Sequence, residues 1–186
     1  MLIGSNAAWT HPVLFQRMEQ AKKSNPAMKI VVVDPRITAS TAQSDLDLHI
    51  KSGTDTILFN GLLNYLKQKE AVDRCFVLEN TDFADAAFSA AEPYSPEKVS
   101  ELCDIEHAKV LCFFEWFAAS TSAISFYSMG INQSVSGVDN ANAIINCHLA
   151  TGKIGKPGSG PFSITGQPNA MGGLPLIHIR SCRRSG

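Results

Sequence analysis

The stretch at residues 29–36, Lys-Ile-Val-Val-Val-Asp-Pro-Arg, most constrains what this chain can fold into. Its four consecutive β-branched residues predict a strand buried on both faces, which is typical of parallel sheets covered by helices. Asp34 then lies at the carboxyl end of that strand. Ligands of open α/β sheets bind at this edge, where an acid commonly binds a ribose or another nucleotide group. The alternative is a solvated turn acid, because many buried strands end in Asp-Pro.

The composition is that of one globular domain. The chain has 186 residues, of which 45% are hydrophobic and 18% charged, and its formal net charge is -1. We therefore expect neither a nucleic-acid partner nor a membrane surface, and no apolar run is long enough to span a bilayer. The five cysteines form no Cys-x-x-Cys pair, so neither disulfides nor a metal cluster is predicted within the chain. His148 falls in a helical pattern, where a packed or capping role is expected before a metal ligand.

The first residues precede this strand in a Rossmann-like order. Gly4, Ser5 and Asn6 form a loop after only three apolar residues, which suggests a truncated first strand and a chain that begins inside a larger protein. A helix with Pro12 at its first position follows, capped by Thr10 or His11. Backbone N–H groups and the helix dipole favour phosphate at such a loop. The Gly-x-Gly-x-x-Gly fingerprint of ordinary dinucleotide binding is absent.

Two more loops precede helices. In the loop at residues 52–55, Thr54 or Asp55 is the natural N-cap of an amphipathic helix, and capping alone accounts for both residues. A strand predicted at residues 123–128 runs into residues 129–133, where Gln133 can donate to and accept from a planar heterocycle. The alternative there is a loop stabilised by its own amide side chains.

The remaining pattern completes an α/β domain. Residues 45–50 alternate acidic and apolar side chains and predict a half-buried edge strand. The segment at 105–119 is apolar over most of its helical circumference, so we expect it to be buried. Residues 153–173 show neither helical nor strand periodicity. Further helices are predicted from Pro96, after a Ser95 cap, and over residues 138–151.

These elements predict an α/β fold, a Rossmann-like three-layer domain with a mainly parallel sheet. No catalytic triad, paired catalytic carboxylates or metal-ligand cluster stands out in the sequence. The residues by themselves thus indicate nucleotide-like ligand loops and name no reaction.

Five motifs in the same order resemble the molybdopterin oxidoreductases of the dimethyl sulfoxide reductase family, and within it the nitrate reductases of the assimilatory type. The resemblance covers about residues 1–173. The motifs are Gly4-Ser5-Asn6-Ala7-Ala8-Trp9-Thr10-His11-Pro12, Val32-Val33-Asp34-Pro35-Arg36-Ile37-Thr38, Ser52-Gly53-Thr54-Asp55, Ser128-Met129-Gly130-Ile131-Asn132-Gln133 and Pro161-Phe162-Ser163-Ile164-Thr165-Gly166-Gln167-Pro168-Asn169-Ala170-Met171.

The resemblance implies that these loops surround a molybdopterin guanine dinucleotide carrying molybdenum. One loop would contact the cofactor, a second would read its nucleotide end, a third would add a further contact, and a fourth would lie near the pterin and the metal. No catalytic residue or metal ligand is expected within the chain. In that order the implied contacts are Gly4, Ser5, Asn6, Ala7 and Trp9; Asp34, Pro35, Arg36 and Thr38; Gly53, Thr54 and Asp55; and Met129 and Gln133.

The resemblance also implies regions that this chain lacks. A cysteine cluster for a 4Fe-4S centre and a cysteine ligating molybdenum would precede residue 1. We expect residues 1–173 to be the central dinucleotide-binding-like α/β domain of a larger molybdoenzyme, and residues 174–186 to be a non-native or disordered tail. The isolated fragment is expected to be inactive.

The leading hypothesis is a fragment of a molybdenum-dependent nitrate reductase that converts nitrate to nitrite in cytoplasmic nitrate assimilation. Its partners would be the missing domains of the same polypeptide, an electron-donor protein or domain, and nitrate. A formate dehydrogenase-like molybdoenzyme is the alternative within the family. A non-catalytic nucleotide-binding module and a scaffold domain are the alternatives outside it.

Overall fold

The computed structural model describes residues 1–164, and its fold is built around one parallel sheet. Its strand order is β3-β2-β1-β4-β5, and all four pairings are parallel. The carboxyl ends of all five strands therefore meet at one edge, as the mainly parallel prediction requires. The strands are β1 (Leu2–Ile3), β2 (Val31–Val33), β3 (Leu46–Leu48), β4 (Ile124–Tyr127) and β5 (Gly160–Ser163).

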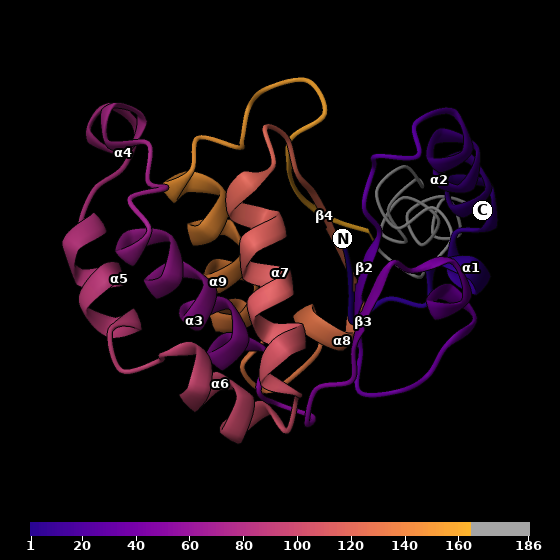
Figure 1. The fold of residues 1–186 in the computed structure, drawn as a ribbon, viewed down its shortest axis with the longest axis horizontal. Helices are drawn as coiled ribbons and strands as arrows, with labels where there is room; N and C mark the ends of the chain where they lie inside the picture. The colour runs from indigo at the N-terminus through magenta and orange to yellow at the C-terminus, as the bar shows by residue number, and fades with distance from the viewer. Residues whose placement is uncertain (165–186) are drawn as a thin grey trace, which may run out of the picture.

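Helices cover both faces of the sheet, which gives the expected three layers (Figure 1). Helices α1 (Ala7–Thr10) and α2 (Pro12–Ser24) lie to the right of the sheet in this view, and a larger helical group lies to its left. A 3-10 helix, η1 (Ala39–Gln43), lies between β2 and β3 in the chain. The helices from α3 onward are α3 (Asp55–Gln68), α4 (Arg74–Asn80), α5 (Ala84–Ala91), α6 (Pro96–Cys103), α7 (His107–Ala119), α8 (Met129–Asn132) and α9 (Gly137–Ala150).

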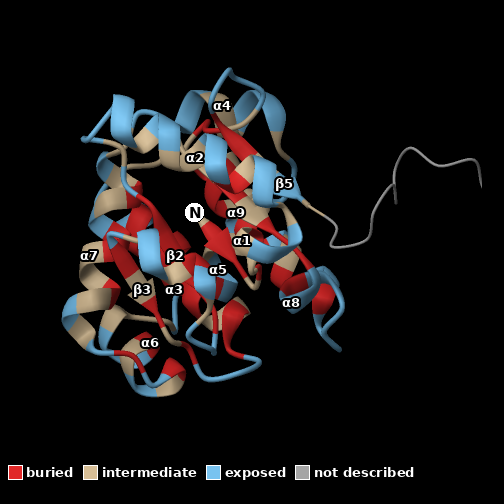
Figure 2. Cartoon of the chain, turned by 90° about the vertical axis from the view of Figure 1, so that its right-hand side faces the viewer, coloured by how far each residue is buried: buried red, intermediate tan, exposed pale blue. Residues whose placement is uncertain are grey.

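Alternation along the strands divides the core into two parts. Ile3, Val31 and Val33 face the large cluster formed with the left-hand helices, whereas Leu2 and Val32 face a small cluster under α2. Because both faces of β1 and β2 are covered, these strands are apolar at every position. Figure 2 shows the buried strands between helices whose outer surfaces are exposed.

The heavily apolar segment at 105–119 forms α7 and is buried, as predicted. Phe113 and Phe114 are both at most 1% exposed, and the Phe113 ring meets Phe59 of α3 edge-on at 6.1 Å. The predicted edge strand is β3, at the end of the sheet, and the side chain of Asp47 is 38% exposed. Within residues 1–164, the structure has no helix of the length and apolarity needed to cross a membrane.

The structure has a strand, β5, within residues 153–173, where the sequence shows no periodicity and no strand was predicted. This strand is defined by pairing with β4, from Ile124 opposite Gly160 to Tyr127 opposite Ser163. β5 lies at the edge of the sheet, where Pro161 is tolerated and an apolar alternation is not required. The predicted segments beyond residue 164, including the tail at 174–186, lie outside the described residues.

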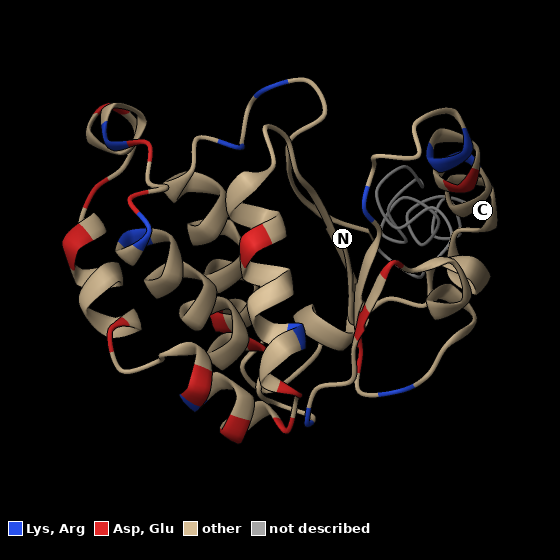
Figure 3. Ribbon diagram, in the orientation of Figure 1, with Lys and Arg blue, Asp and Glu red and all other residues tan. Residues whose placement is uncertain are grey.

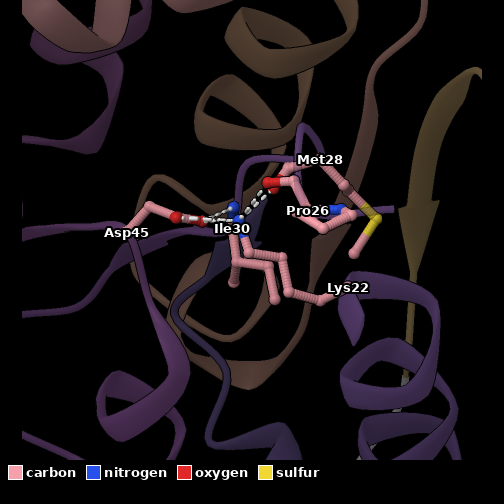
Figure 4. Close-up of polar contacts among 5 residues, drawn as sticks. All are labelled: Lys22, Pro26, Met28, Ile30 and Asp45. Atoms are coloured by element: carbon pink, nitrogen blue, oxygen red, sulfur yellow. Dashed lines mark hydrogen bonds and ion pairs between the residues drawn. The ribbon is translucent and has the colours of Figure 1, made fainter. Parts of the chain in front are cut away.

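A lysine clamp fixes the end of α2 to the sheet (Figure 4). The Nζ atom of Lys22 lies 2.8 Å and 2.9 Å from the two carboxylate oxygens of Asp45, and it also donates to the carbonyls of Pro26 and Met28. Asp45 in turn accepts the N–H of Ile30 at 2.7 Å. Burial raises the pKa of Asp45, but the hydrogen bonds from Lys22 and Ile30 outweigh it and leave that pKa lowered.

Candidate functional site

The loops after β1 and β4 touch through two glycines. The N–H of Gly130 donates to the carbonyl of Gly4 at 3.1 Å, and the hydroxyl of Ser128 donates to the same oxygen at 3.1 Å. A Cβ on Gly130 would lie 2.7 Å from the Cα of Gly4, so no side chain fits there. Gly4 itself has a φ of 53°, which favours glycine. The sequence therefore brings the first and fourth predicted loops into backbone contact.

Two buried carboxylates stand at the ends of the neighbouring strands. Asp34 is 2% exposed and follows β2; its Oδ1 accepts the N–H of Arg36 at 2.9 Å. Asp55 is 8% exposed and begins α3, after β3. Burial raises the pKa of Asp55 to about 6; a hydrogen bond from its own backbone N–H opposes this, and the charge of Asp34 adds to it. In Figure 3 acidic positions lie along the β2–β3 side of the sheet.

Thr54 occupies the predicted N-cap position of α3 without capping the helix through its side chain. Its hydroxyl donates instead to the carbonyl of Lys51 at 2.6 Å and closes the preceding turn. Gly53 in that turn has a φ of 83° and open space around it. The capping interpretation is therefore correct for the position of Thr54 and wrong for its hydrogen bond.

Asn6 is fixed by a residue that the sequence analysis did not single out. The hydroxyl of Ser40, on η1, donates to Oδ1 of Asn6 at 3.0 Å and accepts the N–H of Ala8 at 3.0 Å. Ser40 is fully buried, although it lies in a polar stretch with no helix or strand period. Its only sequence signal is its position, shortly after the Asp34 loop.

The fourth candidate loop forms the short helix α8. Met129, its first residue, is 39% exposed, and Gln133, just after its end, is exposed. Within residues 1–164 no hydrogen bond joins Gln133 to Asn6, Asp34 or Asp55, so these side chains share the edge of the sheet without direct contact. The exposed members of the candidate set are Trp9, Pro35, Arg36, Gly53, Met129 and Gln133; Gly4, Asn6 and Thr38 are intermediate, and Ser5, Ala7, Asp34, Thr54 and Asp55 are buried.

Two loops at this edge each carry a buried hydroxyl without a hydrogen-bond partner within residues 1–164. Among the described residues, Oγ of Ser5 and Oγ1 of Thr38 are buried and have no hydrogen-bond partner. Both belong to loops at the carboxyl edge, and a buried hydroxyl without a partner is unfavourable. The loops of the same edge also carry two buried carboxylates, which can accept hydrogen bonds, and exposed apolar side chains such as Trp9 and Ile37. These residue types fit a molybdopterin guanine dinucleotide.

His148 lies away from this edge in the core. The hydroxyl of Ser125 donates to its Nε2 at 2.6 Å, and its Nδ1–H donates to the carbonyl of Lys153 at 2.8 Å, which defines a neutral tautomer. Burial lowers the pKa of His148 to about 4. Within residues 1–164 the structure has no group of three or more His, Cys, Asp or Glu side chains arranged to hold a metal.

Comparisons with known proteins place the chain in a family. A sequence model described as molybdopterin oxidoreductase matches residues 1–183. The nitrate reductase of Klebsiella oxytoca is 50% identical over 175 residues, which cover 93% of this chain and 19% of that protein. The F420-dependent formate dehydrogenase 1 subunit alpha of Methanococcus maripaludis is 33% identical over 181 residues, covering 95% of this chain and 27% of that subunit.

A solved structure shows the same fold. Acetylene hydratase from Pelobacter acetylenicus superposes with a TM-score of 0.75 at 23% identity, covering 84% of this chain and 22% of that one. The chain spans between about a fifth and a quarter of the length of the nitrate reductases that it matches. On the match of its sequence from residue 1 to residue 183, this chain belongs to the molybdopterin oxidoreductase family.

Proposed function

We propose that this chain is the part of a molybdenum-dependent nitrate reductase that binds the guanine dinucleotide form of the molybdopterin cofactor. The observation that carries the proposal is one sheet edge whose loops hold both the buried carboxylates of Asp34 and Asp55 and the unsatisfied hydroxyls of Ser5 and Thr38. The 50% identity to the Klebsiella oxytoca nitrate reductase supports nitrate as the substrate of the whole protein.

Each loop would hold a different part of the cofactor. The N–H groups of Ser5, Asn6 and Ala7, where the turn after Gly4 enters α1, can bind the pyrophosphate, since the N–H of Gly4 already donates to the carbonyl of Val33. At pH 7, above the pKa of about 6 of Asp55, the Asp55 carboxylate can accept hydrogen bonds from guanine N–H groups or ribose hydroxyls. The oxygens of Asp34 are acceptors for the same groups. Further contacts to the nucleotide end would come from Pro35, Arg36, Thr38, Gly53 and Thr54.

The pterin end would lie toward α8 and α1. Gln133 can donate to and accept from the pterin edge, while Met129 and Trp9 offer exposed apolar contact. When bound, the cofactor supplies the redox chemistry of molybdenum, and the residues of this chain bind and orient it. In this proposal the 4Fe-4S centre belongs to another part of the polypeptide.

The whole enzyme would reduce nitrate to nitrite in the cytoplasm during nitrate assimilation, with electrons from a donor protein or domain. Purifying the longest polypeptide that carries this chain tests the proposal. We expect bound molybdenum, guanosine monophosphate after acid hydrolysis of the pyrophosphate, and nitrite formation with a reduced dye. Cell fractionation tests the location, and activity in a periplasmic fraction would overturn the cytoplasmic assignment.

Three other results would each contradict the assignment to a nitrate reductase. Formate oxidation without nitrate reduction would assign the chain to a formate dehydrogenase, as the 33% identity to the Methanococcus maripaludis subunit allows. Absence of molybdenum and of nitrate reduction would reject a molybdoenzyme. Tight binding of guanosine diphosphate to this chain, without any pterin, would favour a non-catalytic nucleotide-binding module.

A further inference from the structure

Helix α8 is too short to hold its own orientation. It has four residues, Met129–Asn132, and a helix of this length is marginal without tertiary contacts. Met129 begins it and Gln133 follows it, so the directions of both side chains depend on how α8 is anchored. Ile131 is its buried residue, at 0% exposure.

A chain of side-chain hydrogen bonds anchors α8 to the first turn of α3. The hydroxyl of Thr56 donates to Oδ1 of Asn140 at 2.5 Å, and Nδ2 of Asn140 donates to the hydroxyl of Ser134 at 2.9 Å. The hydroxyl of Ser134 then donates to the carbonyl of Ile131 at 2.9 Å. Every donor points the same way, from α3 through α9 into α8. We call Thr56, Asn140 and Ser134 the polar relay.

Asn140 is the central member of the relay. It is 3% exposed, and its amide uses both its acceptor and its donor, so neither buried atom is left unpaired. Helices α9 and α8 also meet closely, because a Cβ on Gly137 of α9 would lie 2.5 Å from the carbonyl oxygen of Asn132 of α8. A hydrogen-bonded network around a buried amide whose oxygen and nitrogen are both paired favours a single arrangement.

We propose that Asn140 is a positioning residue that couples the two ends of the cofactor site. Thr56 directly follows Asp55, which belongs to the nucleotide-end contacts, and Ser134 directly follows Gln133, which belongs to the pterin-end contacts. The relay keeps these two loops in register although their candidate side chains do not touch. This inference rests on the proposed function and adds a residue that contacts neither end of the cofactor.

Variants of the exposed member test the relay without threatening the fold. Ser134→Ala removes two of the three hydrogen bonds, from Asn140 and to Ile131, and Ser134→Thr retains the hydroxyl. Ser136→Ala is the matched control, because Ser136 is also exposed, stands two residues away and makes no capping hydrogen bond through its side chain. Asn140→Asp, in which the donor to Ser134 is lost and the acceptor for Thr56 is kept, tests the buried member.

The first measurement is amide hydrogen exchange at residues 131–134 in this chain. Ser134→Ala and Asn140→Asp should exchange about two- to tenfold faster, the range set by one neutral hydrogen bond, with Ser134→Thr and Ser136→Ala like the parent. The second is the rate of molybdenum loss from the longest polypeptide that carries the chain. Ser134→Ala should lose the metal about two- to tenfold faster than Ser136→Ala, by more than any fall in its melting temperature accounts for, since the variant also leaves the buried Nδ2 of Asn140 without its acceptor.

The outcomes separate this inference from the proposed function. Equal exchange in Ser134→Ala and Ser136→Ala would overturn the relay. Faster exchange with unaltered molybdenum retention, or metal loss that merely follows a lower melting temperature, would overturn the coupling and leave the proposed function standing. A parent polypeptide without molybdenum would overturn both, and the exchange data would then describe an anchor with no cofactor to position.

Discussion

Ser40 Oγ lies 3.0 Å from Oδ1 of Asn6, and this hydrogen bond joins two loops that are more than 30 residues apart in the chain. The same hydroxyl accepts the N–H of Ala8 at 3.0 Å. The conformation of the first loop therefore depends on η1, a segment that makes none of the predicted contacts. Ser40, which is not itself one of the candidate contacts, therefore fixes the orientation of the Asn6 side chain.

Replacing Ser40 by Ala should destabilise the chain and loosen the first loop. The change leaves the N–H of Ala8 and Oδ1 of Asn6 without a partner, which costs about 1–3 kcal/mol in the free energy of unfolding. Urea unfolding followed by circular dichroism measures the loss. Ser52→Ala, at an exposed position, should stay within about 0.5 kcal/mol of the parent. A Ser40→Ala variant as stable as Ser52→Ala would show that the bridge contributes nothing.

A methyl group at Gly130 should force the first and fourth loops apart. The new Cβ would lie 2.7 Å from the Cα of Gly4, and neither backbone can turn away as a flexible side chain would. We expect Gly130→Ala to lower the free energy of unfolding by about 1–3 kcal/mol. Gly155→Ala is the contrasting variant: at Gly155 φ is 69° but space is open, so backbone strain alone costs about 1 kcal/mol. Equal losses would mean that the close approach does not matter.

The strands and the larger helices were predictable because burial imposes a pattern. Residues 30–33 are apolar on both faces, and the alternation at 45–50 predicted an edge strand. β5 had no such pattern because an edge strand with Pro161 takes its register from β4 rather than from its own side chains.

The candidate site was predictable only as a set of strand-end loops. Parallel strands bring Asp34 and Asp55 to one edge whatever their chemistry, so the sequence could predict that proximity. The roles of Ser40 and Asn140 arise from contacts 34 and 84 residues away, and no local pattern records such pairings. A polar side chain in a short irregular segment looks the same whether it is solvated or buried.

His148 should make the chain less stable in acid. Burial lowers its pKa from 6.5 to about 4, so the unfolded chain binds this proton more tightly than the folded chain. The contribution of neutral His148 to the free energy of unfolding is fully present above pH 6.5. It is lost as the pH falls toward 4, by up to about 3 kcal/mol. Urea unfolding between pH 4 and pH 7 measures it. His148→Gln should flatten this part of the curve, and an unchanged slope in the variant would show that His148 is already solvated or charged in the folded chain.

Asp55 should act in the opposite direction over part of the same range. Burial raises its pKa from 3.8 to about 6, so the folded chain holds this proton more tightly than the unfolded chain. The stabilising effect of the protonated form is present below pH 3.8 and is lost as the pH rises through 6. Asp55→Asn removes the buried charge and should stabilise the isolated chain at pH 7 by up to about 3 kcal/mol.

That gain in stability should come with a loss of cofactor. An amide at position 55 replaces one acceptor oxygen by a donor, so it cannot offer two acceptor oxygens to guanine N–H groups or ribose hydroxyls, as the carboxylate could. In the longest polypeptide that carries the chain, Asp55→Asn should hold less molybdenum than the parent, although the chain itself unfolds at higher urea. Asp47→Asn, on the exposed side of β3, is the control and should change neither quantity strongly. If Asp55→Asn gained stability and kept its molybdenum, the buried charge of Asp55 would have no role in cofactor binding. If the variant gained stability and lost the cofactor, Asp55 would destabilise the folded chain because cofactor binding requires its carboxylate.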